Sequence, residues 1–399
     1  MKLIAIAALL AAALASPAAL AQKKYDPGAT DKIIKIGNTN PYSGPASAYG
    51  TIGKTIGAYW KMVNEKGGIN GRMVDWVSYD DGYSPPKTVE MARKLVEQDR
   101  VLLLFQTLGT PPNTAIHKYM NSKKVPQSFV ATGATKWNDA RNFPWTMGWQ
   151  PNYQTEGRIY AEHILKNNPK AKIGVLYQND DYGKDYLKGF KDGLGDKAAS
   201  MIVKEVSYEV TDPTVDSQIV QLQASGADTF FNITTPKFAA QAIRKAHDTG
   251  WKPMHYLNNV STSIAGVLKP AGLEKSVGVI STQYYKDPND DQWKNDPAVL
   301  EWKAFMKKYY PEGNVADNAN IYAYAVAQTM HQVLKQAGDN LTRANVMKQA
   351  ASLQGYRPEG LLPGIRINTG ANDYAPIESE QLIRFDGQQW ERFGPIIGK

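Results

Sequence analysis

A glycine-rich stretch near the N-terminus carries residue types that could hold a phosphate. Residues 43–55 read SGPASAYGTIGKT and follow a short apolar run, so the GKT at 53–55 would open a helix after a strand and a turn. A phosphate loop needs G-x-x-x-x-G-K-[ST], because its backbone N–H groups wrap the phosphates and its lysine reaches their outer oxygens. Ala48 stands where the first glycine is needed, and Pro45 stiffens the turn. The stretch therefore predicts no nucleotide site, and the glycine repeat at 53 and 57 favours close packing of a helix.

The remaining reactive residue types form no catalytic pattern. There is no G-x-S-x-G sequence and no H-E-x-x-H pair, so neither a hydrolase nucleophile nor a zinc site is indicated. Asp80 and Asp81 end a predicted strand, where adjacent carboxylates more often anchor the next turn than act as an acid/base pair. We expect no catalytic residue, no metal ligand and no cofactor. The five histidines, to which no role is assigned, are His117, His163, His247, His255 and His331.

Four turns have the composition of a binding site for a small anion. They are residues 41–50, the pair Gly109 and Thr110, the segment 131–135, and the pair 234–235. Each follows a predicted strand, and in open α/β sheets ligands lie at strand carboxyl ends against helix N-termini, where free N–H groups favour negative charge. Small residues let a ligand approach the backbone, and hydroxyls supply donors. The alternative that Thr110 and Thr235 only cap helices stays open.

These turns are held by short apolar strands that alternate with helical patterns. Apolar residues spaced by three and four, as at Val89, Ala92 and Leu95, mark one face of a helix. This alternation is typical of α/β proteins whose mostly parallel sheets carry helices on both faces. The predicted strands are residues 33–38, 74–79, 101–106, 127–131, 172–177, 201–208, 229–233, 254–257 and 277–282.

Helix starts and the C-terminal region complete the prediction. A capping residue before proline favours a helix start, because its side chain accepts a bond and proline needs no N–H there. Residues 297–353 predict three helices, and GIRINTG, EQLIRFDG and WERFG predict strands. Two successive β/α halves that meet near residues 145–155 suggest two lobes. The five capping pairs are Ser84-Pro85, Thr110-Pro111, Asp212-Pro213, Thr235-Pro236 and Asp296-Pro297.

The N-terminus and the overall composition indicate where the chain works. Residues 1–21 read as a secretory signal peptide, with an early lysine, a short apolar run and a small-x-small site before Gln22. The chain has no cysteine, which excludes disulfides and a lipid anchor, so we expect a free periplasmic protein. The net charge of +8 is scattered without a basic run, and this argues against nucleic acid as a partner.

Several longer motifs together resemble a known family over nearly the whole mature chain. They are IKIGNTNPYSGPASAYG, NEKGGINGR, YDDGYSPPKTVEMARKLVEQD, FVATGAT, VLYQNDDYGKDY and FFNITTPKFAAQAIRKAHDTGW. On these residues the chain is similar to the periplasmic solute-binding proteins of ABC importers of the branched-chain amino acid (leucine/isoleucine/valine-binding protein) type. The resemblance implies the type I periplasmic-binding fold: two α/β lobes, each a mostly parallel sheet flanked by helices, joined by three crossovers.

The same resemblance implies lobe boundaries, contacts and partners. Lobe 1 would combine residues 30–149 with 284–355, and lobe 2 would combine 150–283 with 356–399. We expect a monomer that closes on a ligand and docks on an inner-membrane ABC permease driven by a cytoplasmic ATPase. Gly109, Thr110, Gly133 and Thr135 of lobe 1 would meet the ligand's carboxylate with Tyr49 alongside, and Tyr182 and Thr235 of lobe 2 would close over it.

Departures from the family pattern bear on the ligand. Amino-acid binders of the family place an acid after the strand that here reads MHYLNNVST, and Val260 takes that position. An unpaired ammonium in a closed cleft would cost several kcal/mol. Asn152 and Tyr153 stand where a carboxylate is common in relatives, and Trp149 adds a flat apolar surface that could instead be lobe core. The hypothesis is therefore a small aromatic or other apolar organic acid.

Three alternatives stay open from the sequence. The ligand could be a branched-chain or other amino acid, taken up by the same mechanism. The chain could instead be a sensing module that reports its ligand to a membrane receptor, with the same fold and cleft. An exported enzyme is the third, and the lack of a visible nucleophile–base pair argues against it.

Overall fold

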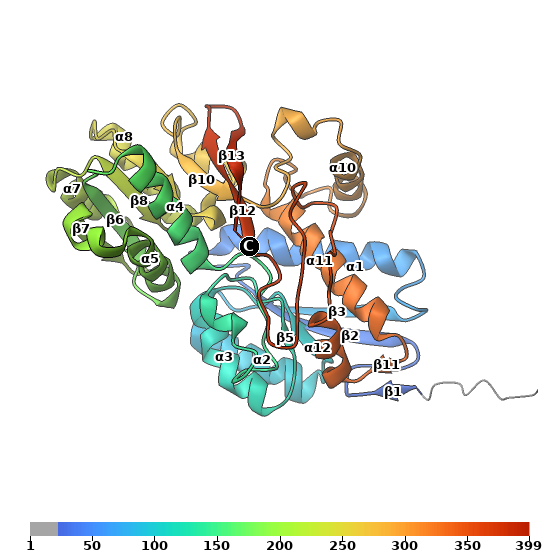
Figure 1. Cartoon of the computed structure of the whole chain (residues 1–399). Coiled ribbons are helices and arrows are strands. Elements are labelled where there is room, and N and C mark those ends of the chain that lie inside the picture. Colours follow the sequence, from blue (N-terminus) through green and yellow to red (C-terminus); the bar gives the residue numbers. More distant parts are fainter. Residues whose placement is uncertain (1–22, 399) are drawn as a thin grey trace, which may run out of the picture.

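The computed structural model describes residues 23–398, which form two α/β lobes (Figure 1). The predicted signal peptide lies outside the described residues. Lobe 1 is built on a parallel sheet with the strand order β3-β2-β4-β5, and lobe 2 on a sheet with the order β13-β12-β10-β9-β8-β6-β7. This is the predicted α/β fold class. Within residues 23–398 no helix combines the length and the apolar character that a membrane crossing requires.

Lobe 1 gathers its elements from both ends of the chain. Its strands are β2 (Ile33–Asn40), β3 (Met73–Asp80), β4 (Leu103–Phe105) and β5 (Gln127–Ser128), with a ribbon of β1 (Lys24–Tyr25) and β11 (Asn340–Leu341) at its end. Its helices are α1 (Gly50–Glu65), α2 (Pro85–Arg93), α3 (Thr110–Ser122), α10 (Pro297–Tyr309), α11 (Ala319–Ala337) and α12 (Arg343–Ala350).

Lobe 2 is nearly continuous in sequence. Its parallel strands are β6 (Ile173–Gln178), β7 (Ile202–Tyr208), β8 (Thr229–Ile233), β9 (Met254–Leu257) and β10 (Ile280–Gln283). The hairpin of β12 (Ser379–Phe385) and β13 (Trp390–Gly398) extends the sheet antiparallel to β10. Its helices are α4 (Tyr153–Asn167), α5 (Asp181–Leu194), α6 (Ala198–Met201), α7 (Asp216–Ala224), α8 (Pro236–Asp248) and α9 (Lys269–Ala271).

Single turns of 3-10 or π helix join these elements, several of them beside strand ends. They are η1 (Ser47–Tyr49), η2 (Lys94–Gln98), η3 (Thr135–Asn138), η4 (Gly195–Lys197), η5 (Asn259–Ser261), η6 (Ile264–Leu268) and η7 (Asp291–Trp293).

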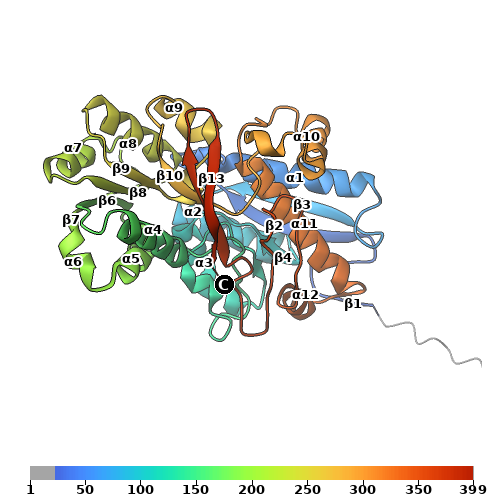
Figure 2. The same ribbon diagram turned by 45° about the horizontal axis from the view of Figure 1, so that its top comes forward.

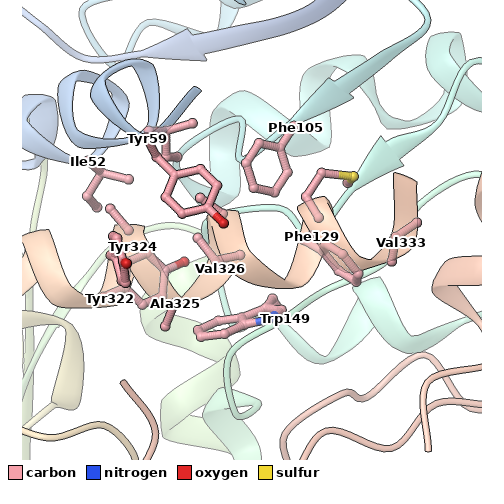
Figure 3. Close-up of a cluster of buried hydrophobic side chains, with 14 of the residues drawn as sticks. Ile52, Tyr59, Phe105, Phe129, Trp149, Tyr322, Tyr324, Ala325, Val326 and Val333 are labelled. Atoms are coloured by element: carbon pink, nitrogen blue, oxygen red, sulfur yellow. The ribbon is translucent and has the colours of Figure 1, made fainter. Parts of the chain in front are cut away.

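The core of lobe 1 forms around helix α11, which is buried along most of its length. Figure 3 shows Tyr324, Val326 and Val333 of this helix among Tyr59 of α1 and Phe105 of β4. Helices α1 and α11 therefore lie side by side although some 250 residues of chain separate them (Figure 2). Lobe 1 can form its core only when the N-terminal and C-terminal parts of the chain are both present.

The chain passes between the lobes near residues 150–152, 284–287 and 378. Trp149 and Ile377 pack in the core of lobe 1, while Tyr153 packs in lobe 2 and β12 joins its sheet. The sequence assigned residues 356–399 to lobe 2. In the structure the apolar segment 361–377 packs in the core of lobe 1, and the last passage comes about 20 residues later.

The nine predicted strands coincide with β2 to β10, and α10, α11 and α12 are the three predicted helices. Two local predictions were wrong. The GIRINTG segment forms only two isolated bridges, Tyr356 with Ile367 and Gly370 with Asp373. Asp212-Pro213 starts no helix. The Asp212 carboxylate instead accepts the backbone N–H of Glu209, which lies earlier in the chain (2.9 Å), and so closes a turn that precedes it. Gly53 does serve close packing in α1, since a Cβ there would lie 2.2 Å from Tyr42 Oη.

Candidate ligand-binding cleft between the lobes

A cleft between the lobes collects the carboxyl ends of strands from both sheets. It holds about 810 Å³ of space not filled by atoms, its open mouth included, which is in the range of small-molecule sites. Six helices begin at this cleft, and a cap or first-turn residue of each lines it: α1, α3, α4, α5, α8 and α11. Because helix N-termini present unpaired N–H groups, they make the cleft attractive to an anion.

Seven of the ten residues predicted for the site line this cleft. Helices of lobe 1 contribute three of them and elements of lobe 2 contribute four, so the predicted residues meet from both sides. They are Tyr49, Gly109 and Thr110, and Tyr153, Tyr182, Thr235 and Val260.

Gly133 and Thr135 lie in the predicted loop but not on the cleft wall. Both the backbone N–H and the hydroxyl of Thr135 donate to Asp185 Oδ2, at 2.8 and 2.9 Å, so this residue ties its loop to α5. Gly133 lies behind Tyr153, and a Cβ there would come within 2.7 Å of that ring. The hydroxyl that does reach Thr110 is that of Thr132, with 2.6 Å between the two Oγ1 atoms. Of the predicted loop 131–135, Ala131 lines the cleft, whereas Gly133 and Thr135 do not.

Trp149 belongs to the core of lobe 1. Its side chain is fully buried and its indole N–H donates to Thr329 of α11 at 3.1 Å (Figure 3). The ring packs edge-on against Tyr284 and Tyr322, which do line the cleft. The prediction that Trp149 contacts the ligand is therefore corrected: it supports the tyrosines that form the wall.

The turn before α3 is rigidly held and offers one backbone donor. Gly109 has φ +95°, and the Asn113 side chain donates to the carbonyls of Thr107 and Gly109, both at 2.8 Å. Pro111 and Pro112 carry no N–H, so Thr110 supplies the only N–H among the first three residues of this helix. A ligand carboxylate at this turn would meet that N–H and the Thr110 hydroxyl.

Tyrosines dominate the wall of the cleft. Burial raises the pKa of each of them, Tyr153 to about 12, so at neutral pH the phenols stay protonated and can donate hydrogen bonds. No lysine, arginine or histidine of the described chain lines the cleft. Polar recognition here depends on neutral donors. The seven tyrosines are Tyr49, Tyr83, Tyr153, Tyr182, Tyr284, Tyr285 and Tyr322.

The wall contributed by lobe 2 is fixed from behind by polar contacts. The Asn258 side chain donates to Tyr182 Oη, and the backbone N–H of Asn259 donates to Glu156 Oε1 at 2.7 Å. Thr235 is held by Tyr208, whose hydroxyl accepts the Thr235 N–H at 3.0 Å. The wall is thus preorganised, although nothing in it carries a net charge toward the cleft.

The wall residues missed from the sequence include Tyr83, Tyr284, Tyr285, Asp317 and Tyr322. Tyr83 and the Tyr284-Tyr285 pair directly follow strands, so the rule that located Gly109 and Thr110 applied to them as well. Tyr83 also has φ +61°, an uncommon backbone conformation that is concentrated at functional sites. Asp317 and Tyr322 carried a weaker signal, as residues flanking the start of a buried helix.

The lobes contact each other directly across the cleft. Tyr49 Oη donates to Val260 O at 3.0 Å, Ser263 Oγ donates to Asp317 Oδ1 at 2.9 Å, and Asn318 Nδ2 donates to Thr262 Oγ1 at 3.3 Å. These bonds can exist only when the lobes are close together. They therefore add to the stability of the closed arrangement.

Tyr49→Phe is expected to weaken ligand binding about fivefold, because a hydrogen bond that favours closure, worth about 1 kcal/mol, is lost. Isothermal titration calorimetry measures this. Tyr374→Phe is the matched control, since Tyr374 Oη also donates to a backbone carbonyl, that of Pro144 at 3.1 Å, but within lobe 1. Equal losses of affinity in the two variants would contradict a role for Tyr49 in closure.

The fold and the cleft together define a two-lobed α/β ligand-binding protein. The profile of the family described as periplasmic binding protein matches residues 33–388. The chain belongs to this family. The resemblance seen in the sequence motifs is therefore confirmed.

Curated relatives and solved structures agree with this assignment. The Leu/Ile/Val-binding protein homolog 1 of Brucella suis is 26% identical over 321 residues, which cover 78% of this chain and 80% of the relative. The Leu/Ile/Val-binding protein of Escherichia coli is 26% identical over 326 residues, with coverages of 79% and 83%.

Two solved structures share the fold. A branched chain amino acid ABC transporter protein of Thermus thermophilus with bound valine superimposes with a TM-score of 0.82 at 15% identity, covering 92% of this chain and 97% of that one. A fatty acid ABC transporter substrate-binding protein of Thermomonospora curvata gives 0.77 at 23%, with coverages of 94% and 95%. At these identities the likeness concerns the fold, which is the predicted type I periplasmic-binding fold.

Proposed function

We propose that this chain captures a small carboxylate-bearing ligand in the periplasm and delivers it to the membrane permease of an ABC importer. The family supports a binding role, and relatives named as ABC transporter proteins support delivery to a permease. The predicted signal peptide supports export. Ligand binds the closed form more tightly than the open form and so shifts the population toward closure, which the permease then recognises.

The proposed ligand class is inferred from the cleft, which is lined by tyrosines and lies at the N-termini of six helices. N–H groups and hydroxyls around Thr110 can bind a carboxylate without a basic side chain. Phenol rings on both walls offer apolar faces to the body of the ligand while their hydroxyls stay available to its polar groups. An aromatic or other apolar organic acid suits this arrangement.

The position of Val260 supports an acid over an α-amino acid. The wall of lobe 2 at this point consists of Val260, Asn259 and Ser263, and its nearest carboxylate, Glu156, lies behind Asn259. An ammonium placed here would find no anionic partner in the wall of lobe 2, and burial without a partner would cost several kcal/mol; Asp317, which bonds to Ser263, reaches this point from lobe 1.

Amino-acid binding is the second candidate, and one observation favours it. Asp317 of lobe 1 lines the cleft and could accept a bond from an ammonium. The curated relatives are named for leucine, isoleucine and valine, which points the same way.

Binding of organic acids is tested by thermal shift and by analysis of the bound molecule. We expect aryl and alkyl acids to raise the melting temperature of the mature chain and leucine, isoleucine and valine to leave it unchanged. Mass spectrometry of small molecules released on denaturation should identify an acid. A shift with leucine larger than that with any acid would instead support amino-acid binding.

A further inference from the structure

Asp317 lines the cleft, and its hydrogen bonds occupy only one of its two carboxylate oxygens. Asp317 Oδ1 accepts the Ser263 hydroxyl at 2.9 Å and the Ala319 N–H at 3.1 Å. Ser263 Oγ itself accepts the N–H of Gly266 at 2.9 Å, so its proton is directed at Asp317. Within residues 23–398 neither an ion pair nor a donor to Oδ2 of Asp317 is present. One oxygen of a cleft-lining carboxylate is therefore left for a ligand.

Asp317 and Thr110 lie at different places along the cleft. The Thr114 hydroxyl, one turn into α3, donates to Asp181 at the start of α5, which follows β6. Asp317 bonds to Ser263, in the loop that follows β9. Strand β8 lies between β6 and β9, so two strand spacings, roughly 10 Å, separate Asp181 from Ser263, the lobe 2 partners of Thr114 and Asp317.

This separation decides which ligands can use both points. In an α-amino acid the carboxylate and the ammonium are attached to the same carbon, so they cannot reach Thr110 and Asp317 together. A molecule with its two polar groups at opposite ends can. Between the points the cleft is walled by phenol rings, which suit an apolar body.

The geometry points to a two-ended ligand: an acid whose carboxylate binds at Thr110 and whose far end carries a hydrogen-bond donor that Asp317 accepts. This inference rests on the proposed capture of an organic acid and narrows it to donor-bearing acids, of which hydroxyl and ammonium forms are the two sources. Asp317 then acts as a specificity determinant. An acid without a donor would leave Oδ2 of Asp317 without a partner in the cleft, which costs affinity.

The preference for a donor is measurable with three matched acids. They are 3-phenylpropanoate, 3-(4-hydroxyphenyl)propanoate and 3-(4-aminomethylphenyl)propanoate, titrated calorimetrically into the mature chain, with L-tyrosine as the α-amino acid. We expect at least one donor-bearing acid to bind about tenfold tighter than 3-phenylpropanoate, and L-tyrosine to bind more weakly than that acid.

Variants of Asp317 separate its role from a general loss of stability. In Asp317→Ala the preference for a donor-bearing acid over 3-phenylpropanoate should fall to less than about threefold, whatever the absolute affinities, because the acceptor is gone. Asp317→Asn keeps an acceptor oxygen, so it should retain binding of the hydroxyl acid and lose that of the ammonium acid. Glu312→Gln removes an exposed carboxylate from the same loop. It should change neither the affinity of the hydroxyl acid nor that of the ammonium acid relative to 3-phenylpropanoate.

Four results would overturn the inference. A wild-type protein that binds 3-phenylpropanoate as tightly as its donor-bearing forms, or an Asp317→Ala variant with full preference, would remove Asp317 as determinant while acid capture stands. Tightest binding of L-tyrosine would refute the two-ended ligand. Failure of every acid to bind would refute acid capture itself, and the inference with it.

Discussion

Gly109→Ala is expected to abolish measurable ligand binding, with an affinity loss of about 100-fold or more. The backbone of Gly109 has φ +95°, which a side chain disfavours, and an added Cβ would lie 2.4 Å from Tyr83 Cε2 and 3.1 Å from Pro112 Cδ. Strain and overpacking together cost about 3 kcal/mol, and the ring of Tyr83 would be displaced into the ligand space. Calorimetric titration of the acid ligand measures the loss.

A substitution at a second glycine tests whether backbone strain alone would produce this loss of affinity. Gly67 has φ +96° and nothing within 4 Å of its built Cβ, so Gly67→Ala introduces the same strain at the end of α1 without a clash. It should lower the free energy of unfolding by about 1 kcal/mol and leave affinity unchanged. If Gly109→Ala bound ligand as well as Gly67→Ala does, the turn before α3 would not be part of the site.

Glu156 is expected to contribute about 3 kcal/mol more to the free energy of unfolding at pH 4.5 than at pH 7. This side chain is buried in lobe 2, and burial raises its pKa to about 7, although it accepts the hydroxyls of Tyr160 (2.7 Å) and Tyr186 (2.5 Å). Burial and the nearby Glu156 raise the pKa of Glu380 well above its ordinary value. At Glu156 the folded state therefore holds more protons than the unfolded state in this window, so the contribution of this side chain to stability is greatest at the acidic end. Burial lowers the pKa of His117 to about 4 and that of His255 to about 3, so these two side chains contribute in the opposite sense over the same window.

Glu156→Gln should remove this pH-dependent contribution and make the protein more stable than wild type at pH 8. Denaturant unfolding at a series of pH values measures both effects. Glu162→Gln lies on the same helix α4 with its side chain exposed, and it should reproduce the wild-type profile. A stability difference between wild type and Glu156→Gln that stayed constant from pH 4.5 to 7 would contradict this assignment.

The sequence predicted those elements whose local apolar pattern agrees with their role in the folded structure. The strands β2 to β10 are short apolar runs bounded by turn residues, and their pattern is enough to locate them. GIRINTG shows the same apolar alternation but pairs with no strand, because its isoleucines are buried against lobe 1 instead. Pattern alone cannot distinguish these two uses of an apolar residue. The late return of the chain to lobe 2 was missed for the same reason.

The site was predictable to the level of loops and less so to the level of side chains. Gly109 and Thr110 follow from the rule for strand ends, and the structure brings them together with Tyr153 and Tyr182 from the other lobe. Whether Thr132 or Thr135 faces Thr110 depends on one turn of backbone and on Asp185, which lies 50 residues further along the chain. Trp149 shows the same limit, since the sequence alone did not distinguish a wall residue from the layer behind it.

The pairing of β1 with β11 sets an order of events during synthesis. Lys24 and Tyr25 have no strand partner until Asn340 and Leu341 have been made, and the core of lobe 1 likewise waits for α11. Lobe 2 has most of its sheet in the continuous stretch from β6 to β10, so it can form first. The β1 segment thus waits for its strand partner during most of translation.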